Sequence, residues 1–385
     1  MIYADFNGSA PLCNDVSKYL VKRLQDGPYA NPNSIHSLGK KIMFGMEKCR
    51  RSLAKTLGCE TNQIIFNSGS SEGITQIFNS LLQENPSKEK NIIITSGIEH
   101  SAVVQCCEKY QATGYNILTI KTRENGVVDL GHLEELLREN GKRTALLTVM
   151  AANNENGIIQ PFQEIGKLAQ KNNIPYFSDT TQYIGKTQFN FSESNLDYAV
   201  LSSHKIGALI GSGLIIAKDP SKLVPLVLGG GQEKGLRGGT QNYIGIETVA
   251  VAMDSFEQNK DKLKQVNDLR VKFEKNIRAK FPELVIIGDD SPRLASTTMI
   301  SYPGIHGQAV QIELESQDVF VTTSSACSDN KPETSRVLKA MGIGDEVGRG
   351  VIRISLCLGT TPAIYEKIEV ALENAYNKLI KIKSF

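Results

Sequence analysis

The sequence predicts an α/β protein built around a mostly parallel sheet that helices cover on both faces. Short apolar segments rich in β-branched residues recur along the first two thirds of the chain, and helix-like segments lie between them. Strands that are buried on both faces have such continuous apolar sequences. We expect a seven-stranded sheet, and the segments that carry the pattern are 63–69, 91–97, 144–150, 174–180, 198–205 and 212–218.

Helices are predicted where apolar residues recur at intervals of three and four. The first strong one covers residues 40–58, where Gly58 is the residue type that commonly ends a helix. Three more are expected at 74–82, near 100–112 and at 162–172. Each of these three follows a predicted strand, as the crossover helices of a parallel sheet do.

The character of the sequence changes near residue 250. Residues 250–281 form a long amphipathic helical stretch rich in Lys and Glu, and strand-like segments and a last helix from about residue 362 follow it. This order predicts a second, smaller α+β domain. We therefore expect a large domain over residues 16–249 and a small domain made of residues 1–15 and 250–385.

Composition narrows the classes of function. The net charge is +2 and no run of five or more basic residues occurs, so no direct nucleic-acid partner is expected. No segment approaches the roughly 18 apolar residues of a membrane span, and the start of the chain does not resemble a signal peptide. Seven cysteines at irregular spacing, without a C-x-x-C, predict a reducing cytoplasm and no bound metal.

Polar and titratable residues follow the predicted strands, at the edge of the sheet where ligands bind in such folds. Ser70 and Ser71 lie between the first strand and its helix, which predicts either an anion cradle or a plain capping box. Taken singly, His100 and Asn154 would be interpreted as core or turn residues. Five such strand ends in succession predict one ligand site, and the later members are His100, Asn154, Asp179, Gln182, Ser202, His204 and Lys205.

Pyridoxal 5′-phosphate (PLP) is the ligand that these groups fit. Its phosphate favours a helix N-terminus, its ring nitrogen favours a carboxylate such as Asp179, and its aldehyde forms a Schiff base with a lysine. Lys205 follows an apolar strand and has no other charged residue for several positions on either side, His204 aside. A partly apolar site would keep its amine uncharged and nucleophilic.

Two fragments also match signatures of serine β-lactamases and penicillin-binding proteins. Residues 202–205 match S-x-x-K and residues 328–330 match S-D-N. The third signature, K-T-G, is absent further along the chain, and the S-x-x-K serine should begin a helix. Because Ser202 ends a predicted strand, we do not expect that chemistry.

Residues 322–333 (TTSSACSDNKPE) predict a loop with Cys327 in its middle. A cysteine in such a loop is either a reactive thiol or an ordinary loop residue. Arg353 lies inside an apolar strand and needs an anion, which is either a structural carboxylate or that of a substrate. The remaining cysteines lie in or beside apolar stretches and are expected to be buried and inert; they are Cys13, Cys49, Cys59, Cys106, Cys107 and Cys357.

Ten short motifs, spread in order along nearly the whole chain, carry a family resemblance. They are YADFNGSAP (3–11), NPNSIHSLG (31–39), IIFNSGSSEG (64–73), EHSAV (99–103), NNENG (153–157), DTTQ (179–182), SSHK (202–205), GGGQEKGLRGGTQN (229–242), SSACS (324–328) and IRISL (352–356). Together they resemble the NifS/IscS-type cysteine desulfurases, which are class-V aminotransferase relatives and PLP enzymes of fold-type I. The resemblance implies that fold, with a large PLP-binding domain and a smaller C-terminal domain that carries the cysteine loop.

The resemblance also implies a role for each matching residue. Lys205 would hold PLP and move the substrate Cα proton, and Cys327 would accept the sulfur. Arg353 would bind the substrate carboxylate, beside the loop of Asn31. Thr240 would reach the phosphate of a neighbouring subunit, which implies a homodimer. Asp179 would pair with the ring nitrogen of PLP, and Gln182 and Asn154 would lie on the side of the ring oxygen. His100 would stack on the ring and take part in catalysis. The residues at the phosphate would be Ser70, Ser71, Ser202 and His204.

The implied reaction converts L-cysteine to L-alanine and leaves a persulfide on Cys327, from which an acceptor protein takes the sulfur. Two alternatives stay open. One is another fold-type I PLP enzyme, such as an aminotransferase or a selenocysteine lyase, that does not use Cys327; the other is an inactive relative that acts as a scaffold. Departures from the family pattern, such as Leu228 before the triple glycine, leave the acceptor open between an iron–sulfur scaffold and a tRNA- or DNA-thiolation enzyme.

Overall fold

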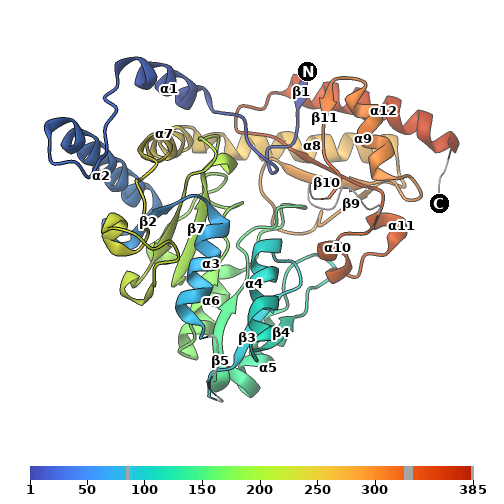
Figure 1. Ribbon diagram of the computed structural model, residues 1–385. Coiled ribbons are helices and arrows are strands. Elements are labelled where there is room, and N and C mark those ends of the chain that lie inside the picture. Colours follow the sequence, from blue (N-terminus) through green and yellow to red (C-terminus); the bar gives the residue numbers. More distant parts are fainter. Residues whose placement is uncertain (84–86, 88, 325–332, 383–385) are drawn as a thin grey trace.

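A seven-stranded sheet forms the centre of the larger part of the molecule (Figure 1). The computed structural model describes residues 1–83, 87, 89–324 and 333–382. The strand order is β2-β8-β7-β6-β5-β3-β4, and β8 is antiparallel to both of its neighbours. The strands are β2 (Ile64–Asn67), β3 (Ile92–Ser96), β4 (Asn116–Ile120), β5 (Thr144–Thr148), β6 (Tyr176–Ser178), β7 (Tyr198–Ser202) and β8 (Gly213–Ala217). The prediction of a mostly parallel seven-stranded sheet is therefore confirmed.

The sequence pattern located every strand of this sheet except β4. All residues of β3, β5 and β8 are buried, so these strands have the continuous apolar sequences of a doubly covered sheet. Strand β4 lies at the edge, pairs only with β3, and leaves Asn116 and Thr119 exposed. Its mixed sequence therefore gave no comparable signal.

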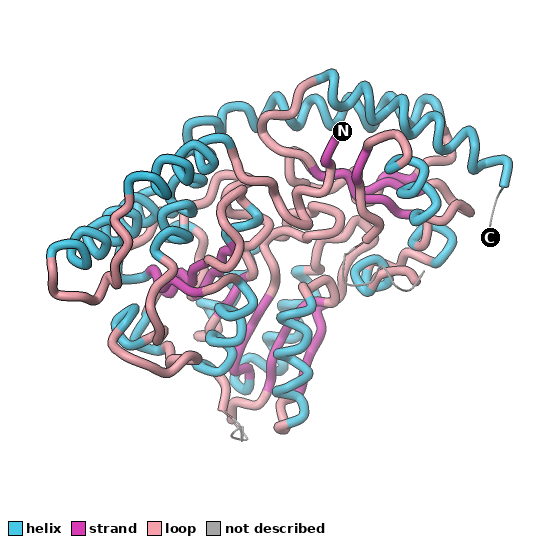
Figure 2. The backbone as a smooth tube through the Cα atoms, turned by 45° about the horizontal axis from the view of Figure 1, so that its top comes forward, coloured by secondary structure: helices cyan, strands magenta, loops and turns pink. Residues whose placement is uncertain are grey.

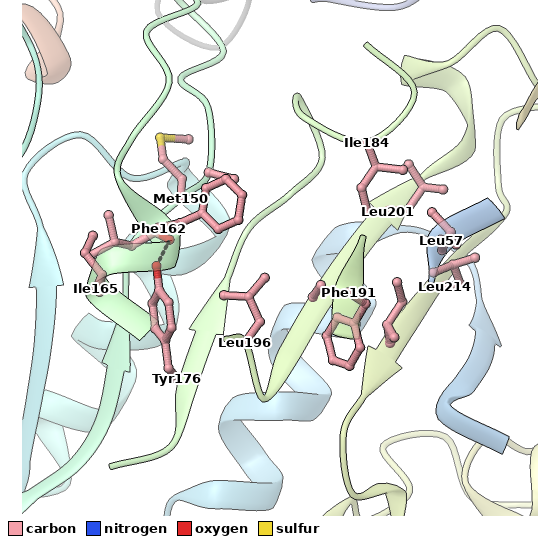
Figure 3. Packing of buried hydrophobic residues seen from close by; sticks show 14 of the residues in the cluster. Leu57, Met150, Phe162, Ile165, Tyr176, Ile184, Phe191, Leu196, Leu201 and Leu214 are labelled. Atoms are coloured by element: carbon pink, nitrogen blue, oxygen red, sulfur yellow. Dashed lines mark hydrogen bonds between the residues drawn. The ribbon is translucent and has the colours of Figure 1, made fainter. Parts of the chain in front are cut away.

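Helices cover both faces of the sheet, as Figure 1 shows. On one face α3 and α4 enclose a core that includes Ile77, Phe78 and Ile93. On the other face α2, α6 and α7 enclose a larger core, part of which Figure 3 shows around Phe162 and Tyr176. The helices of this part are α1 (Asn14–Asp26), α2 (Ser37–Leu57), α3 (Ser70–Leu81), α4 (Ser101–Ala112), α5 (Leu130–Asn140), α6 (Phe162–Lys171) and α7 (Tyr243–Asn259).

The long helical stretch predicted over residues 250–281 consists of two helices. Helix α7 begins earlier, at Tyr243, and packs on α2, whereas α8 (Leu263–Lys280) packs on α12 (Pro362–Leu379). A 3-10 turn, Lys260–Lys262, separates them. The stretch therefore passes from the core of the sheet to the core of the C-terminal part.

The C-terminal part has its own core and a three-stranded antiparallel sheet of β9 (Val285–Ile286), β10 (Thr297–Ser301) and β12 (Val351–Ser355). The first strand of the chain, β1 (Ile2–Tyr3), pairs here in parallel with β11 (Val319–Phe320). Figures 1 and 2 show the N-terminus beside these C-terminal elements. The exact domain limits proposed from the sequence stay a prediction. The remaining helices are α9 (Gly307–Glu315), α10 (Arg336–Ala340) and α11 (Asp345–Gly348).

Short 3-10 turns connect several of these elements, and one of them carries Lys205. The turns are Thr61–Gln63, Gly141–Arg143, Phe191–Glu193, Ser203–Lys205, Pro220–Lys222, Gln232–Gly235, Lys260–Lys262 and Ile380–Ile382.

Of the helices in the described part of the chain, none has both the length and the apolar sequence that a membrane span needs.

Candidate active site

The N-terminus of α3 forms an anion cradle at the carboxyl end of β2. Gly69, at the N-cap, has a φ of 150°, and no side chain of the described residues caps the helix there. A Cβ on Gly69 would lie 3.2 Å from Ser202 Oγ at the end of β7. Thr181 Oγ1 lies 2.6 Å from Ser70 Oγ and joins the cradle to the loop after β6. Ser70, Ser71 and Ser202 therefore surround uncapped backbone N–H groups, as an anion cradle requires.

His100 is the N-cap of α4, at the carboxyl end of β3. Its Nδ1 accepts a hydrogen bond from Ala102 N at 3.2 Å. Because Nδ1 accepts, the neutral ring carries its proton on Nε2. The preceding residue, Glu99, is 1% exposed, and its Oε1 accepts from Ser96 Oγ at 2.5 Å and from Met150 N at 3.0 Å. Burial raises the pKa of Glu99 to about 8, against the lowering effect of these two hydrogen bonds.

Asp179 and Gln182 follow β6 and are both buried. The carboxylate of Asp179 accepts from Thr181 N at 3.0 Å. It also lies near enough to Glu99 for its charge to raise the pKa of that carboxyl. Gln182 Nε2 donates to the carbonyl oxygen of Asn7 at 2.9 Å. The loop after β6 therefore presents one carboxylate and one amide to the same edge of the sheet.

Lys205 lies in the 3-10 turn after β7 and reaches the N-terminal segment of the chain. Its Nζ donates to the carbonyl oxygens of Asn7 at 2.9 Å and Gly8 at 2.6 Å. Beside it, His204 Nδ1 lies 3.1 Å from Ser9 Oγ. Burial, with the nearby charges of Lys205 and Lys186, lowers the pKa of His204 to about 4, so this imidazole is neutral at pH 7.

Asn7, which was not predicted as a site residue, connects these strand ends with the C-terminal part of the chain. Its Nδ2 donates to Thr297 Oγ1 at 3.1 Å and to the carbonyl oxygen of Asn154 at 3.3 Å. Its backbone N–H donates to Ser355 Oγ at 2.9 Å. Lys186 Nζ donates to its Oδ1 at 2.7 Å. The nearest signal was its place inside the YADFNGSAP motif, which does not indicate a contact.

Arg353 occupies the C-terminal side of the site and is 2% exposed. Its Nη2 lies 2.5 Å from Asp5 Oδ1, so the structural carboxylate considered from the sequence exists. Its Nη1 donates to the carbonyl oxygens of Asn154 at 2.8 Å and Ser324 at 3.3 Å. Its buried Nε has no partner among the described residues. Arg353 therefore joins the strand end of Asn154 to the residue that precedes the 325–332 segment.

Cys327 lies outside the described residues, but described residues on both sides of it in the sequence contact the site. After the segment, Ser335 Oγ donates to Glu155 Oε2 at 2.6 Å. Arg336 Nη1 donates to the carbonyl oxygen of Gly97 at 2.9 Å, and its Nη2 donates to that of Glu99. Together with the bond from Arg353 to Ser324, these contacts place Ser324, Ser335 and Arg336 near the residues that follow β3 and β5.

The prediction that the other cysteines are buried is confirmed for Cys106 and Cys107 and wrong for Cys357, whereas Cys13, Cys49 and Cys59 are only partly buried. Cys106 and Cys107 are buried, and burial raises the pKa of Cys49 to about 11 and of Cys59 to about 12. Cys357, expected to be buried, is exposed. It follows β12 at a turn where Thr360 binds its carbonyl oxygen, so the apolar strand before it does not continue over it.

Two predicted site residues, Asn31 and Thr240, lie on exposed loops. Asn31 Oδ1 accepts from Asn33 N at 2.9 Å within its own turn. Asn33 Nδ2 donates to Gln241 Oε1 at 3.1 Å, so the two loops lie together. Their contacts with PLP, substrate or a second subunit stay predictions.

The residues that converge at this edge fit PLP. The N-terminus of α3 suits the phosphate, the buried carboxylate of Asp179 suits the ring nitrogen, and Lys205 Nζ can bond the aldehyde. Arg353 adds a guanidinium whose buried Nε has no partner in the part of the chain that is described, which suits a carboxylate. The arrangement therefore has the features of a PLP enzyme that acts on an amino acid.

Comparison with known proteins agrees with this arrangement. A family profile described as Aminotransferase class-V matches residues 2–364. A cysteine desulfurase of Nostoc sp. (strain PCC 7120) is 33% identical over 100% of this chain and 95% of its own length. The solved structure titled "NifS-like protein" is 32% identical, has a TM-score of 0.90, and is matched over 98% of this chain and 100% of its own. The structure titled "SspA in complex with cysteine" is 28% identical with a TM-score of 0.78, over 92% of this chain and 99% of its own.

The chain belongs to the class-V aminotransferase family, and its fold is that of the fold-type I PLP enzymes. Within that family it belongs with the cysteine desulfurases, because relatives of that name match its full length. It is therefore a PLP-dependent enzyme, and the resemblance inferred from the ten motifs is confirmed.

Proposed function

We propose that this chain removes the sulfur of L-cysteine, releases L-alanine and holds the sulfur as a persulfide on Cys327. The observation that carries the proposal is the position of Arg353, whose guanidinium donates to the carbonyl oxygens of both Asn154 and Ser324. A substrate carboxylate bound there would lie between the strand end of Asn154 and Ser324, which comes three positions before Cys327 in the sequence. Bound PLP supplies an electron sink for the bond that breaks at the substrate Cα.

Three side chains of the site divide the work on the substrate. Lys205 Nζ takes the proton from Cα, and the carbonyl oxygens of Asn7 and Gly8 hold this nitrogen when it is released. The carboxylate of Asp179 keeps the proton on the PLP ring nitrogen. Arg353 binds the substrate carboxylate, for which its planar fork is suited.

The transfer of sulfur from the substrate to Cys327 needs no external oxidant. The Cys327 thiolate attacks the substrate sulfur, an S–S bond forms, and the Cβ–S bond breaks. Its electron pair leaves with Cβ, which takes a proton and becomes the methyl group of alanine. An acceptor thiolate then takes the outer sulfur by the same kind of exchange, and Cys327 returns to a thiolate.

A homodimer is part of the proposal, because one surface exposes several large apolar side chains. Its exposed fractions are 90% at Ile35, 67% at Phe44, 77% at Ile210 and 80% at Leu228. Hydrogen bonds connect the segments that carry these residues, from Asn33 to Gln241, from Gly238 to Val227 and from Asn242 to Gly211. A second copy is the occupant we propose, since the loops of Asn31 and Thr240 lie on this surface.

The dimer is tested by light scattering on the purified protein and on a variant with Ile35→Glu and Leu228→Glu. We expect a dimer for the first and a monomer with weaker PLP binding for the second. The exposed Val370, which lies on α12 in the C-terminal part, provides a control as Val370→Glu. A dimer that persists in the double variant would place the interface elsewhere.

The chemistry of the persulfide limits which acceptor and which compartment are suitable. A protein thiol of an iron–sulfur scaffold or of a thiolation enzyme can take the outer sulfur, and either fits the proposal. A persulfide carrier needs a free thiolate, so we propose a reducing cytoplasm as its compartment.

The reaction is tested by measuring alanine and sulfide from L-cysteine, with excess thiol reductant, for wild type and Cys327→Ala. The proposal expects that the wild type makes both and that the variant makes neither while it keeps its bound PLP. Cys357→Ala is the matched control, because Cys357 is the exposed cysteine among those described, and it should keep full activity. Equal turnover by wild type and Cys327→Ala would assign the chain to PLP enzymes that do not use this thiol.

A further inference from the structure

Lys186 lies beside the PLP lysine and has no role in the reaction described above. Its Nζ donates to Gln182 Oε1 and, at 2.7 Å, to Asn7 Oδ1. The carbonyl oxygen of Asn7 accepts from Gln182 Nε2 at 2.9 Å and from Lys205 Nζ at 2.9 Å. Two lysine nitrogens and one amide therefore meet at the two oxygens of Asn7.

These bonds determine which way the Gln182 amide faces. An amide has an accepting end and a donating end of nearly the same shape, and its NH₂ group cannot accept from a lysine N–H. Lys186 therefore bonds the oxygen of Gln182, and the NH₂ group turns to the opposite side. On that side lies the carbonyl oxygen of Asn7, to which Lys205 also donates.

The surroundings of Lys186 disfavour a charged amine. It lines a cavity of about 490 Å³ together with Lys205, Lys262 and Cys357. Burial and the nearby charges of Lys205 and Arg353 hold the pKa of Lys186 well below its usual range, against the opposite effect of Asp5. A second basic side chain beside Lys205 is electrostatically unfavourable whenever both amines are protonated, and the contacts that Lys186 gains at this position are its hydrogen bonds to Gln182 and Asn7.

We propose that Lys186 is a positioning residue for PLP that acts through Gln182. It holds the amide so that its NH₂ group is presented next to Lys205, where it can donate to the ring oxygen of the cofactor. It also holds the side chain of Asn7, whose carbonyl oxygen keeps the same amide orientation. This inference rests on the attachment of PLP to Lys205 proposed above.

The test is a double-mutant cycle on PLP binding by the apoprotein, with Lys186→Met, Gln182→Met and the double variant. Loss of one buried hydrogen bond of this kind corresponds to about a tenfold weaker Kd, and we expect that loss for Lys186→Met. In the Gln182→Met background the same substitution should change Kd less than about threefold, since the group through which it acts is gone. The visible circular dichroism of bound PLP should change in Lys186→Met and Gln182→Met alike.

Lys262→Met is the matched control, because Lys262 lines the same cavity but donates to Asn259 Oδ1 at 2.8 Å. Its Kd and visible spectrum should equal those of wild type. If Lys186→Met does not fold, Lys186→Gln enters the same cycle with the same expectation. A Kd for the Lys186 variant equal to that of Lys262→Met, or an equal loss in both Gln182 backgrounds, would overturn the proposal.

Borohydride reduction of the wild-type holoenzyme, followed by peptide mapping, reports separately on the attachment of PLP to Lys205. A label elsewhere would refute the proposed function itself. A label on Lys205 with no coupling between Lys186 and Gln182 would refute only the positioning role.

Discussion

Asp5 Oδ1 lies 2.5 Å from Nη2 of Arg353, although the two residues are 348 positions apart. The side chain of Arg353 is 2% exposed and that of Asp5 is 20% exposed. The guanidinium that should bind a substrate carboxylate therefore already has a carboxylate partner in the chain itself. Substrate binding to Arg353 then requires Asp5 to yield or to share that partner.

Asp5→Asn should lower the KM for L-cysteine about threefold to tenfold, because the substrate carboxylate no longer competes with an internal one. The same change should lower the free energy of unfolding in the absence of cysteine by about 1–3 kcal/mol, since a buried charged group loses its partner. Steady-state kinetics and urea unfolding measure the two effects.

Asp15→Asn serves as the control for this variant. Asp15 is exposed and accepts from Ser255 Oγ at 2.6 Å, outside the Arg353 cluster. Its KM should not change. A higher KM for Asp5→Asn would mean that Asp5 helps to bind cysteine instead of competing with it.

The residues of the site that could be predicted are those for which one local rule was enough. Asp179, His100 and Lys205 each follow a buried strand, and parallel strands bring their carboxyl ends to one edge. The strands themselves were visible because both of their faces are covered. The edge strand β4 lacked that signal, and Cys327 remains a prediction from the motif in which it lies.

The residues that could not be predicted depend on contacts between distant parts of the chain. Asn7 meets Lys205 across 198 positions and Thr297 across 290. No periodicity in the sequence reports that the N-terminal segment passes between the sheet and the C-terminal part. Lys186 was missed because a lysine after a turn is ordinarily solvated. Its contact with Asn7 is also one between distant parts of the chain.

Gly69→Ala should weaken PLP binding about tenfold, because the cradle at α3 needs this glycine. Its φ of 150° is a conformation that residues with a Cβ rarely adopt, and a Cβ would lie 3.2 Å from Ser202 Oγ. Fluorescence titration of the apoprotein with PLP measures the Kd.

Gly344→Ala is the control for the glycine variant, since Gly344 has an ordinary φ of −75° and an added Cβ there meets nothing within 4 Å. It should bind PLP like wild type. An unchanged Kd for Gly69→Ala would mean that the phosphate does not bind at the N-terminus of α3.

Glu99 should make the protein less stable as the pH rises from about 4.5 through about 8. Burial raises its folded-state pKa from the ordinary value of about 4.5 to about 8. The folded protein therefore favours the protonated form, so the contribution is complete below about 4.5 and is lost as the pH passes about 8. The slope from one such group is at most about 1.4 kcal/mol per pH unit.

Urea unfolding at several values of pH from about 5 to 8.5, for wild type and Glu99→Gln, measures this contribution. The glutamine variant should lose the slope, because it cannot ionise. Parallel curves for the two proteins would show that Glu99 does not titrate in this range.

Ser335→Ala should slow sulfur transfer without weakening PLP binding. Ser335 Oγ donates to Glu155 Oε2 at 2.6 Å and accepts from Leu338 N at 3.2 Å as the N-cap of α10. It therefore fastens the start of α10, just beyond the segment of Cys327, to the residue after Asn154. Without both bonds the start of α10 is held less firmly beside the site, and loss of the cap alone costs about 1 kcal/mol. We expect kcat for alanine formation to fall about tenfold at an unchanged Kd for PLP.

Ser335→Thr, which keeps the hydroxyl, should restore most of the rate. Ser316→Ala, at the exposed end of α9, should leave the rate unchanged. A loss of PLP affinity in Ser335→Ala would mean that this contact supports the PLP side of the site through Asn154, and that it does not act on the position of Cys327.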